Sequence, residues 1–189
     1  VPVPSGGSTT TTAASLPPPA TTISQLSPGQ AAALLLHRRT CRTNLTTWCT
    51  EALAERDQAP ARHHLFLIDA LKDVAAGRCD RLMVLMPPGS AKSTYASVLF
   101  PAWFLAQPGP PRDVIGTSYN SELAEDFSSK VQKLMKSHGP TLQATVATDN
   151  RKLWYLANGS SYRAAGAKSG ITGRRADLFI IDDPLAGHE

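Results

Sequence analysis

The sequence predicts an α/β fold in which a central, mostly parallel sheet is flanked by helices. Short apolar runs that fit buried strands alternate with amphipathic segments that fit helices. The run at 82–85 leads into a loop of small residues, and the run at 178–181 ends in two aspartates. Polar groups that follow the carboxyl ends of parallel strands gather at one edge of a sheet, so these two runs also predict a site.

The bulk composition sets wide limits. The 189 residues are enough for one domain with a real core and appendages. The net charge of +4 permits contact with nucleic acid but does not argue for it. The cysteines Cys41, Cys49 and Cys79 form no C-x-x-C pair, so we expect neither a disulfide framework nor zinc, and a reducing compartment is favoured. The chain begins with valine and ends near a motif, so we expect it to be a fragment.

Two segments precede the expected domain. Residues 1–30 form a low-complexity leader in which Pro, Thr, Ser and Gly supply twenty positions, and we expect this leader to be disordered. It lacks the basic start of a signal peptide, and no run in the chain is long enough to span a membrane. Residues 31–60 are expected to be a helical N-terminal segment, with Asn44 as an N-cap. Its apolar residues recur at helical spacing, at Leu45, Trp48, Cys49, Ala52 and Leu53.

Residues 61–189 are expected to form one domain, incomplete at its C-terminal end. Pro101 is expected to break or kink the helix that follows the small-residue loop, since proline cannot sit in a helix interior. The pair Asn158-Gly159 predicts a tight hairpin. In chain order, the expected elements are a helix at 62–76, a strand at 82–85, a helix from Lys92, a short helix at 102–107, a strand at 113–118, a helix from Ser121, a hairpin of 153–157 with 160–164, and a strand at 178–181.

The loop at 86–94 reads Met-Pro-Pro-Gly-Ser-Ala-Lys-Ser-Thr and lies between an expected strand and an expected helix. In a P-loop, backbone N–H groups cradle phosphate, a lysine reaches the terminal phosphates and a hydroxyl helps hold Mg²⁺. The match to G-x-x-x-x-G-K-[ST] is imperfect, because Met86 and Ala91 stand where glycines are usual. The alternative interpretation is a Pro/Gly turn that simply enters a helix.

The run at 178–181 followed by Asp182 and Asp183 is typical of a Walker B strand. A carboxylate at the end of such a strand can hold the Mg²⁺ that the P-loop hydroxyl also touches, and a second acid can orient or deprotonate water. The alternative is a buried strand ending in a solvated turn, which the presence of the P-loop-like segment disfavours. An extra strand between the two motif strands indicates a P-loop NTPase of the ASCE type, truncated after the Walker B strand.

Together these segments resemble the N-terminal ATPase domain of the large terminase subunit of tailed bacteriophages, over residues 61–189. The resemblance implies an ATP-hydrolysing motor that drives double-stranded DNA into a procapsid in the host cytoplasm. It also implies a portal protein and a small terminase subunit as partners, a homo-oligomeric ring, and a nuclease domain that this chain lacks. The residues that carry the resemblance are Arg62-His-His-Leu, Asp69-Ala-Leu, the run from Arg81 to Trp103, Thr117-Ser-Tyr, Leu123-Ala-Glu125, Tyr162, Ala165-Gly166, Gly173-Arg-Arg-Ala-Asp177 and Ile181-Asp-Asp-Pro184.

The resemblance also implies roles for single residues in holding ATP and Mg²⁺. Lys92 would contact the β- and γ-phosphates, and Ser93 and Asp182 would hold the metal ion. The remaining nucleotide-binding residues would be the N–H donors Gly89, Ser90 and Ala91, then Thr94 beside Ser93, and His63 and His64 near the base.

Two catalytic roles stay open between candidates. The acid that activates water is Asp183 or Glu189, with Asp183 favoured. Pro88 occupies the loop position where this family often has an arginine. Arg174 or Arg175 would then supply the charge-stabilising arginine, from the same chain or across a ring, unless this pair packs or binds phosphate backbone.

Two other functions fit the same residues. One is a helicase-like ATPase with the same core. The other is a truncated prophage fragment that binds nucleotide poorly or not at all, which the departures at Met86 and Ala91 favour. The coding sequence beyond residue 189 would discriminate among these, by a nuclease with clustered acids, helicase motifs or a stop codon.

Overall fold

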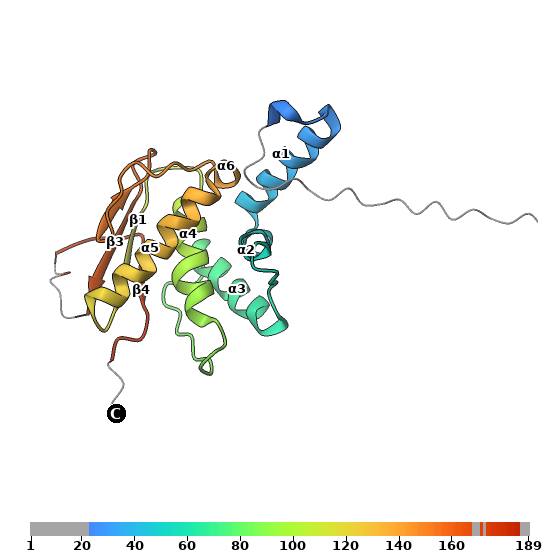
Figure 1. Ribbon diagram of the computed structural model, residues 1–189. Helices are drawn as coiled ribbons and strands as arrows, with labels where there is room; N and C mark the ends of the chain where they lie inside the picture. Colours follow the sequence, from blue (N-terminus) through green and yellow to red (C-terminus); the bar gives the residue numbers. More distant parts are fainter. Residues whose placement is uncertain (1–22, 168–170, 172, 186–189) are drawn as a thin grey trace, which may run out of the picture.

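The computed structural model describes residues 23–167, 171 and 173–185, and its core is a four-stranded sheet in the order β2-β3-β1-β4 (Figure 1). The central strand β1 runs parallel to both β3 and β4, while β2 is antiparallel to β3. Helices flank this mixed, open sheet, so the predicted α/β class is confirmed. The strands are β1 (Asp113–Ser118), β2 (Leu153–Tyr155), β3 (Ser161–Gly166) and β4 (Leu178–Ile181).

The hairpin expected at Asn158-Gly159 is present, and it joins β2 to β3. Gly159 has a φ of 89°, which glycine adopts without strain. On β3, the ring of Tyr162 stacks on that of Trp154 with an interplanar angle of 7°. A Cβ atom at Gly116 would overlap the Tyr162 hydroxyl, so glycine in the central strand is what allows this ring to lie against it.

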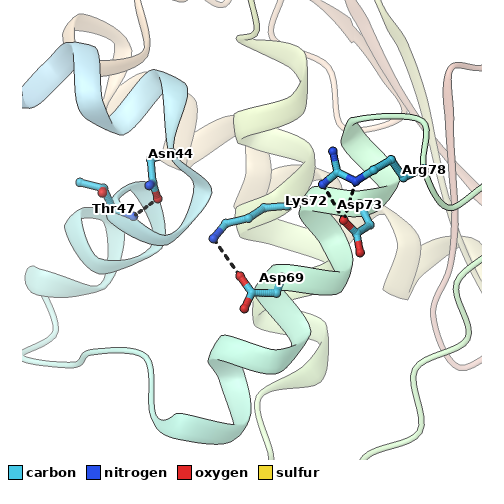
Figure 2. Close-up of polar contacts among 6 residues, drawn as sticks. All are labelled: Asn44, Thr47, Asp69, Lys72, Asp73 and Arg78. Atoms are coloured by element: carbon cyan, nitrogen blue, oxygen red, sulfur yellow. Dashed lines mark hydrogen bonds and ion pairs between the residues drawn. The ribbon is translucent and has the colours of Figure 1, made fainter.

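Three N-terminal helices gather beside the sheet domain: α1 (Pro28–Thr43), α2 (Leu45–Ala54) and α3 (Arg62–Ala75) (Figure 1). The helical segment is thus two helices divided at Asn44, whose side chain accepts a hydrogen bond from the Thr47 N–H at 3.1 Å, as expected of an N-cap (Figure 2). All five apolar residues of the predicted stripe are buried. Two exposed ion pairs, Lys72–Asp69 and Arg78–Asp73, lie near the C-terminal end of α3 (Figure 2).

The helix that starts at Lys92 does not break at Pro101. It widens into a π-helical stretch, η2 (Thr94–Leu99), and continues as α4 (Phe100–Leu105). The Phe100 N–H bonds to the carbonyl of Tyr95, five residues back. Proline has no N–H and its ring crowds the carbonyl four residues earlier, and the wider turn before Pro101 accommodates both effects. The helix therefore continues through Pro101, which was expected to break or kink it.

Helix α5 (Ser121–Ser137) packs against β1 and β3 and is followed by the short α6 (Gly139–Leu142). It begins where expected, but the cap is Asn120, whose side chain accepts from the Leu123 N–H at 2.8 Å. Among the described residues, no helix has the combination of length and apolar character that crossing a bilayer requires.

Tryptophan side chains tie the helical layers together through buried indole N–H groups. That of Trp48 on α2 donates to the carbonyl of Leu99 at 2.9 Å, and that of Trp103 on α4 donates to the carbonyl of Cys41 at 3.1 Å. Buried indoles need such partners, since an unpaired buried donor is costly. These bonds fix the N-terminal helices against the helix that follows the small-residue loop.

The strand expected at 82–85 is wrong. This segment has no ladder partner, and Met83 and Leu85 are 82% and 86% exposed. A cavity of about 630 Å³ separates it from the outer edge of β4, with Leu82 on one side and Ile181 on the other. Within the described residues β4 therefore pairs on one side only, with β1. The apolar run predicted burial, but this segment pairs with no strand in the part of the chain that the structure describes.

Candidate functional site

The candidate site lies at the carboxyl ends of β1 and β4. Because the two strands are parallel and adjacent, their last residues meet at one edge of the sheet. The Asp182 N–H donates to the carbonyl of Thr117 at 2.9 Å, and the Tyr119 N–H donates to the carbonyl of Asp183 at 3.1 Å. These backbone bonds hold both aspartates in place beside β1.

Lys92 meets both aspartates although about ninety residues separate them in sequence. Its Nζ lies 3.0 Å from Oδ1 of Asp183 and 3.6 Å from Oδ1 of Asp182. Asp182 is 5% exposed and Asp183 is 64% exposed, so one carboxylate is enclosed and the other faces solvent. The hydrogen bond that Lys92 donates to Asp183 is the largest influence on this amine. Together with both negative charges it raises the pKa of the amine above its usual value. Lys92 therefore stays charged.

Ser97, which sequence reasoning missed, completes this cluster. Its buried hydroxyl donates to Oδ2 of Asp182 at 2.7 Å. Ser93 was expected beside Asp182, but among the described residues it makes no hydrogen bond with that carboxylate, and it lies half-buried earlier on the same helix. Ser97 follows Ser93 by four residues, and that spacing places two residues on one helix face. This spacing is the signal that could have drawn attention to Ser97.

The loop before Lys92 contains two residues in the left-handed region. Gly89 has a φ of 78° and Ala91 has a φ of 58°. Left-handed residues in a tight loop favour the concave arrangement of backbone N–H groups that binds anions. The Ser90 hydroxyl is buried and has no hydrogen-bond partner among the described residues. Two of the three expected N–H donors therefore have a positive φ, and their contact with phosphate stays a prediction.

The positive φ at Ala91 leads to a prediction. Alanine in this conformation destabilises the folded chain by about 1–2 kcal/mol. Glycine avoids this strain but loses about 0.5–1 kcal/mol more in chain entropy on folding. We expect Ala91→Gly to raise the free energy of unfolding by about 0.5–1 kcal/mol in urea titrations followed by circular dichroism. The matched control is Ala96→Gly in the helical stretch η2, which should lower it by about 1 kcal/mol. A loss of stability in Ala91→Gly would contradict the strained conformation.

His64 anchors the loop to α3. The Ala61 N–H donates to its Nδ1 at 3.0 Å, so Nε2 carries the proton and donates to the carbonyl of Ser90 at 3.0 Å. Its ring stacks on Tyr95, with 4.4 Å between the ring centroids. The ring of His63 lies against that of His64, so the two histidines lie together beside the loop, and their role near a base stays a prediction.

A second hollow, of about 770 Å³, separates α3 from the loop. It is largely apolar, and His63 and Phe66 line one wall while Met83, Leu85 and Pro87 line the other. Apolar surfaces of this kind suit a flat aromatic ring. This hollow is therefore the part of the site where a nucleoside could lie.

The other predicted residues fall outside this cluster. Arg174 and Arg175 are exposed, and their side chains make no hydrogen bond or ion pair with the described residues. Asp177 just beyond them accepts a hydrogen bond from the Asp113 N–H at 2.8 Å, which ties the segment to the start of β1. Thr94 is half-buried at the start of η2. Glu189, the alternative acid, lies outside the described residues.

Comparison with known proteins adds no assignment: no family of known proteins matches the chain, and no curated protein is significantly similar to it.

Proposed function

We propose that this chain binds Mg²⁺-ATP and hydrolyses ATP, as the motor domain of a viral DNA-packaging terminase. The single observation that carries the nucleotide proposal is the meeting of Lys92 with Asp182 and Asp183. A cation from a loop with left-handed residues and two carboxylates at the end of a parallel strand are the parts that P-loop ATPases use. We also propose that the sheet and its helices form a P-loop fold of the ASCE type.

The chemistry of the donor set fits a magnesium nucleotide. Asp182 offers carboxylate oxygen, and the hydroxyls of Ser93 and Ser97 lie on the helix beside it. With Lys92 counted, the cluster of Lys92, Asp182 and Asp183 has a net charge of −1, which favours a divalent cation. The Ser118 hydroxyl, at the end of β1, is also buried with no hydrogen-bond partner among the described residues, so further polar capacity remains at this edge.

Asp182 and Ser93 would hold Mg²⁺, with Ser97 orienting the Asp182 carboxylate through its hydrogen bond. When bound, the ion would neutralise charge that develops on the phosphate oxygens. Lys92 would exchange its contact with Asp183 for a phosphate oxygen. The released Asp183 carboxylate, which is mostly exposed, would then accept a proton from the attacking water.

The packaging role rests on the resemblance described above. It assigns double-stranded DNA, a portal protein and a small terminase subunit as partners, and a ring of copies as the working assembly. The exposed position of Arg174 and Arg175 supports an arginine supplied to a neighbouring copy, since both side chains are free to reach another surface.

The test is ATP turnover by the purified chain, measured as phosphate release with and without double-stranded DNA, and with Mg²⁺ replaced by a chelator. We expect hydrolysis that requires Mg²⁺ and rises with DNA.

Binding of a fluorescent ATP analogue without turnover would instead favour the second candidate, a nucleotide-binding fragment. The observation that favours this candidate is the segment at 82–85, which pairs with no strand among the described residues. The loop that follows it is therefore not held by a strand of the sheet. Absence of both binding and turnover would refute the nucleotide proposal.

A further inference from the structure

Three side chains of metal-ligating type converge between α1 and α2, on helices that lie outside the candidate nucleotide site. They are His37 and Cys41 of α1 and Glu51 of α2. One donor atom from each (an imidazole nitrogen, a thiol sulfur and a carboxylate oxygen) lies within 4.8 Å of the other two. Nothing in the proposed ATPase chemistry uses them, so their convergence needs its own explanation.

The helices bring these groups together in a simple way. His37 and Cys41 are four residues apart, so they project from the same face of α1. Asn44 both ends α1 and begins α2, so the two helices follow each other without a loop. Glu51 on α2 faces His37. The Trp103 indole donates to the backbone carbonyl of Cys41, which fixes that part of α1 against α4. The donor set is therefore held by packed helices rather than by loops.

The distances are close to those that a bound ion would impose. Ligands at about 2.0–2.3 Å from a tetrahedral ion lie about 3.3–3.8 Å from one another. Nε2 of His37 lies 3.5 Å from Sγ of Cys41 and 2.9 Å from Oε2 of Glu51. The donor atoms of Cys41 and Glu51 lie within 4.8 Å of each other. Small adjustments of the His37–Glu51 and Cys41–Glu51 separations would let one ion contact all three donor atoms.

The donor types and their exposure select the ion. Nitrogen, sulfur and carboxylate oxygen together suit a borderline cation, and Zn²⁺ accepts all three. A thiolate and a carboxylate would balance its two positive charges. Cys41 is fully buried, while the side chains of His37 and Glu51 are 22% and 19% exposed. Water can therefore reach the cluster past His37 and Glu51 and fill a fourth coordination position.

We propose that His37, Cys41 and Glu51 bind one Zn²⁺ ion, with water as the fourth ligand, and that the ion fastens α1 to α2. The expectation from cysteine spacing was that the chain has no zinc site. The proposal departs from that expectation, since its third donor comes from a second helix, which cysteine spacing does not describe. The rival explanation is an ordinary ion pair, His37 to Glu51, with the thiol beside it through packing alone.

Titration with Co²⁺, which takes the place of Zn²⁺ and absorbs light, separates the two explanations. The full 189-residue chain is used with any histidine tag removed, because a tag would bind the same ion. We expect one Co²⁺ per chain, a thiolate-to-cobalt charge-transfer band in the near ultraviolet, and loss of the band when Zn²⁺ is added. A chain that gives no such band refutes the proposal.

Variants assign the band to these residues. Cys41→Ser should remove the thiolate band and weaken Co²⁺ binding by at least about tenfold, whereas the control Cys79→Ser, at a partly exposed thiol elsewhere, should leave both unchanged. If Cys41→Ser does not fold by circular dichroism, Glu51→Gln takes its place and should also weaken binding by at least about tenfold. Unchanged affinity in a folded Cys41→Ser or Glu51→Gln chain would overturn the proposal. The readout involves no ATP, so it is independent of the proposed ATPase activity.

Discussion

Lys92→Ala is expected to lower DNA-stimulated ATP hydrolysis by at least about 100-fold, since phosphoryl transfer depends on positioned positive charge. The ammonium group of Lys92 reaches both Asp182 and Asp183, and it would contact the phosphates when nucleotide binds. The measurement is steady-state phosphate release at saturating ATP. Turnover at the unsubstituted rate in this variant would refute the role of the loop.

This experiment needs two controls. Lys133→Ala removes an exposed lysine from α5 and should leave turnover unchanged. Removing Lys92 also takes the cation away from the enclosed carboxylate of Asp182, so we expect a loss of stability on the order of 1–2 kcal/mol. Circular dichroism and a urea titration of Lys92→Ala must therefore show that the chain is folded under the assay conditions, so that lost turnover reports on chemistry.

Asp182→Asn is expected to lower Mg²⁺-dependent ATP turnover by at least about 100-fold while weakening metal-free nucleotide binding far less. Asparagine keeps the shape of the side chain and can still accept the hydrogen bond from the Ser97 hydroxyl, but it loses the negative charge that holds a cation. Turnover is measured over a range of Mg²⁺ concentrations. Binding of a fluorescent nucleotide is measured in the presence of a chelator.

The comparison between these two measurements is what tests a metal role for Asp182. Equal losses in turnover and in metal-free binding would argue that this carboxylate only supports the loop. Asp149→Asn serves as the control, because Asp149 is 79% exposed and pairs with Lys136 at the surface, remote in sequence from both motifs. Its turnover and its Mg²⁺ dependence should match those of the unsubstituted chain.

Local signals in the sequence predicted much of the fold. The Asn158-Gly159 pair predicted the hairpin because a tight turn with φ > 0 needs such residues. The apolar runs at 113–118 and 178–181 became adjacent parallel strands. The meeting of Lys92 with Asp182 was expected from two parallel strands ending at one edge, but only β4 forms, and Lys92 reaches this edge from the start of its own helix.

Other features depend on contacts that local patterns do not encode. The run at 82–85 is as apolar as β4, yet a strand also needs a partner backbone, and periodicity says nothing about partners. The spacing from Ser93 could point to Ser97, but the hydrogen bond of Ser97 to Asp182 depends on how this helix packs beside β4. His64 was expected near a base, but its bond to the Ser90 carbonyl depends on how α3 docks against the loop.

The open edge of β4 has a consequence for the chain in solution. A strand edge with free N–H and C=O groups is a template on which another chain can pair, and apolar neighbours strengthen that tendency. Phe179 and Ile181 on β4 are about half exposed, and Met83 and Leu85 in the segment at 82–85 are mostly exposed. The isolated chain should therefore self-associate as its concentration rises. Light scattering should accompany every kinetic measurement, and rates per chain should be compared at one fixed concentration.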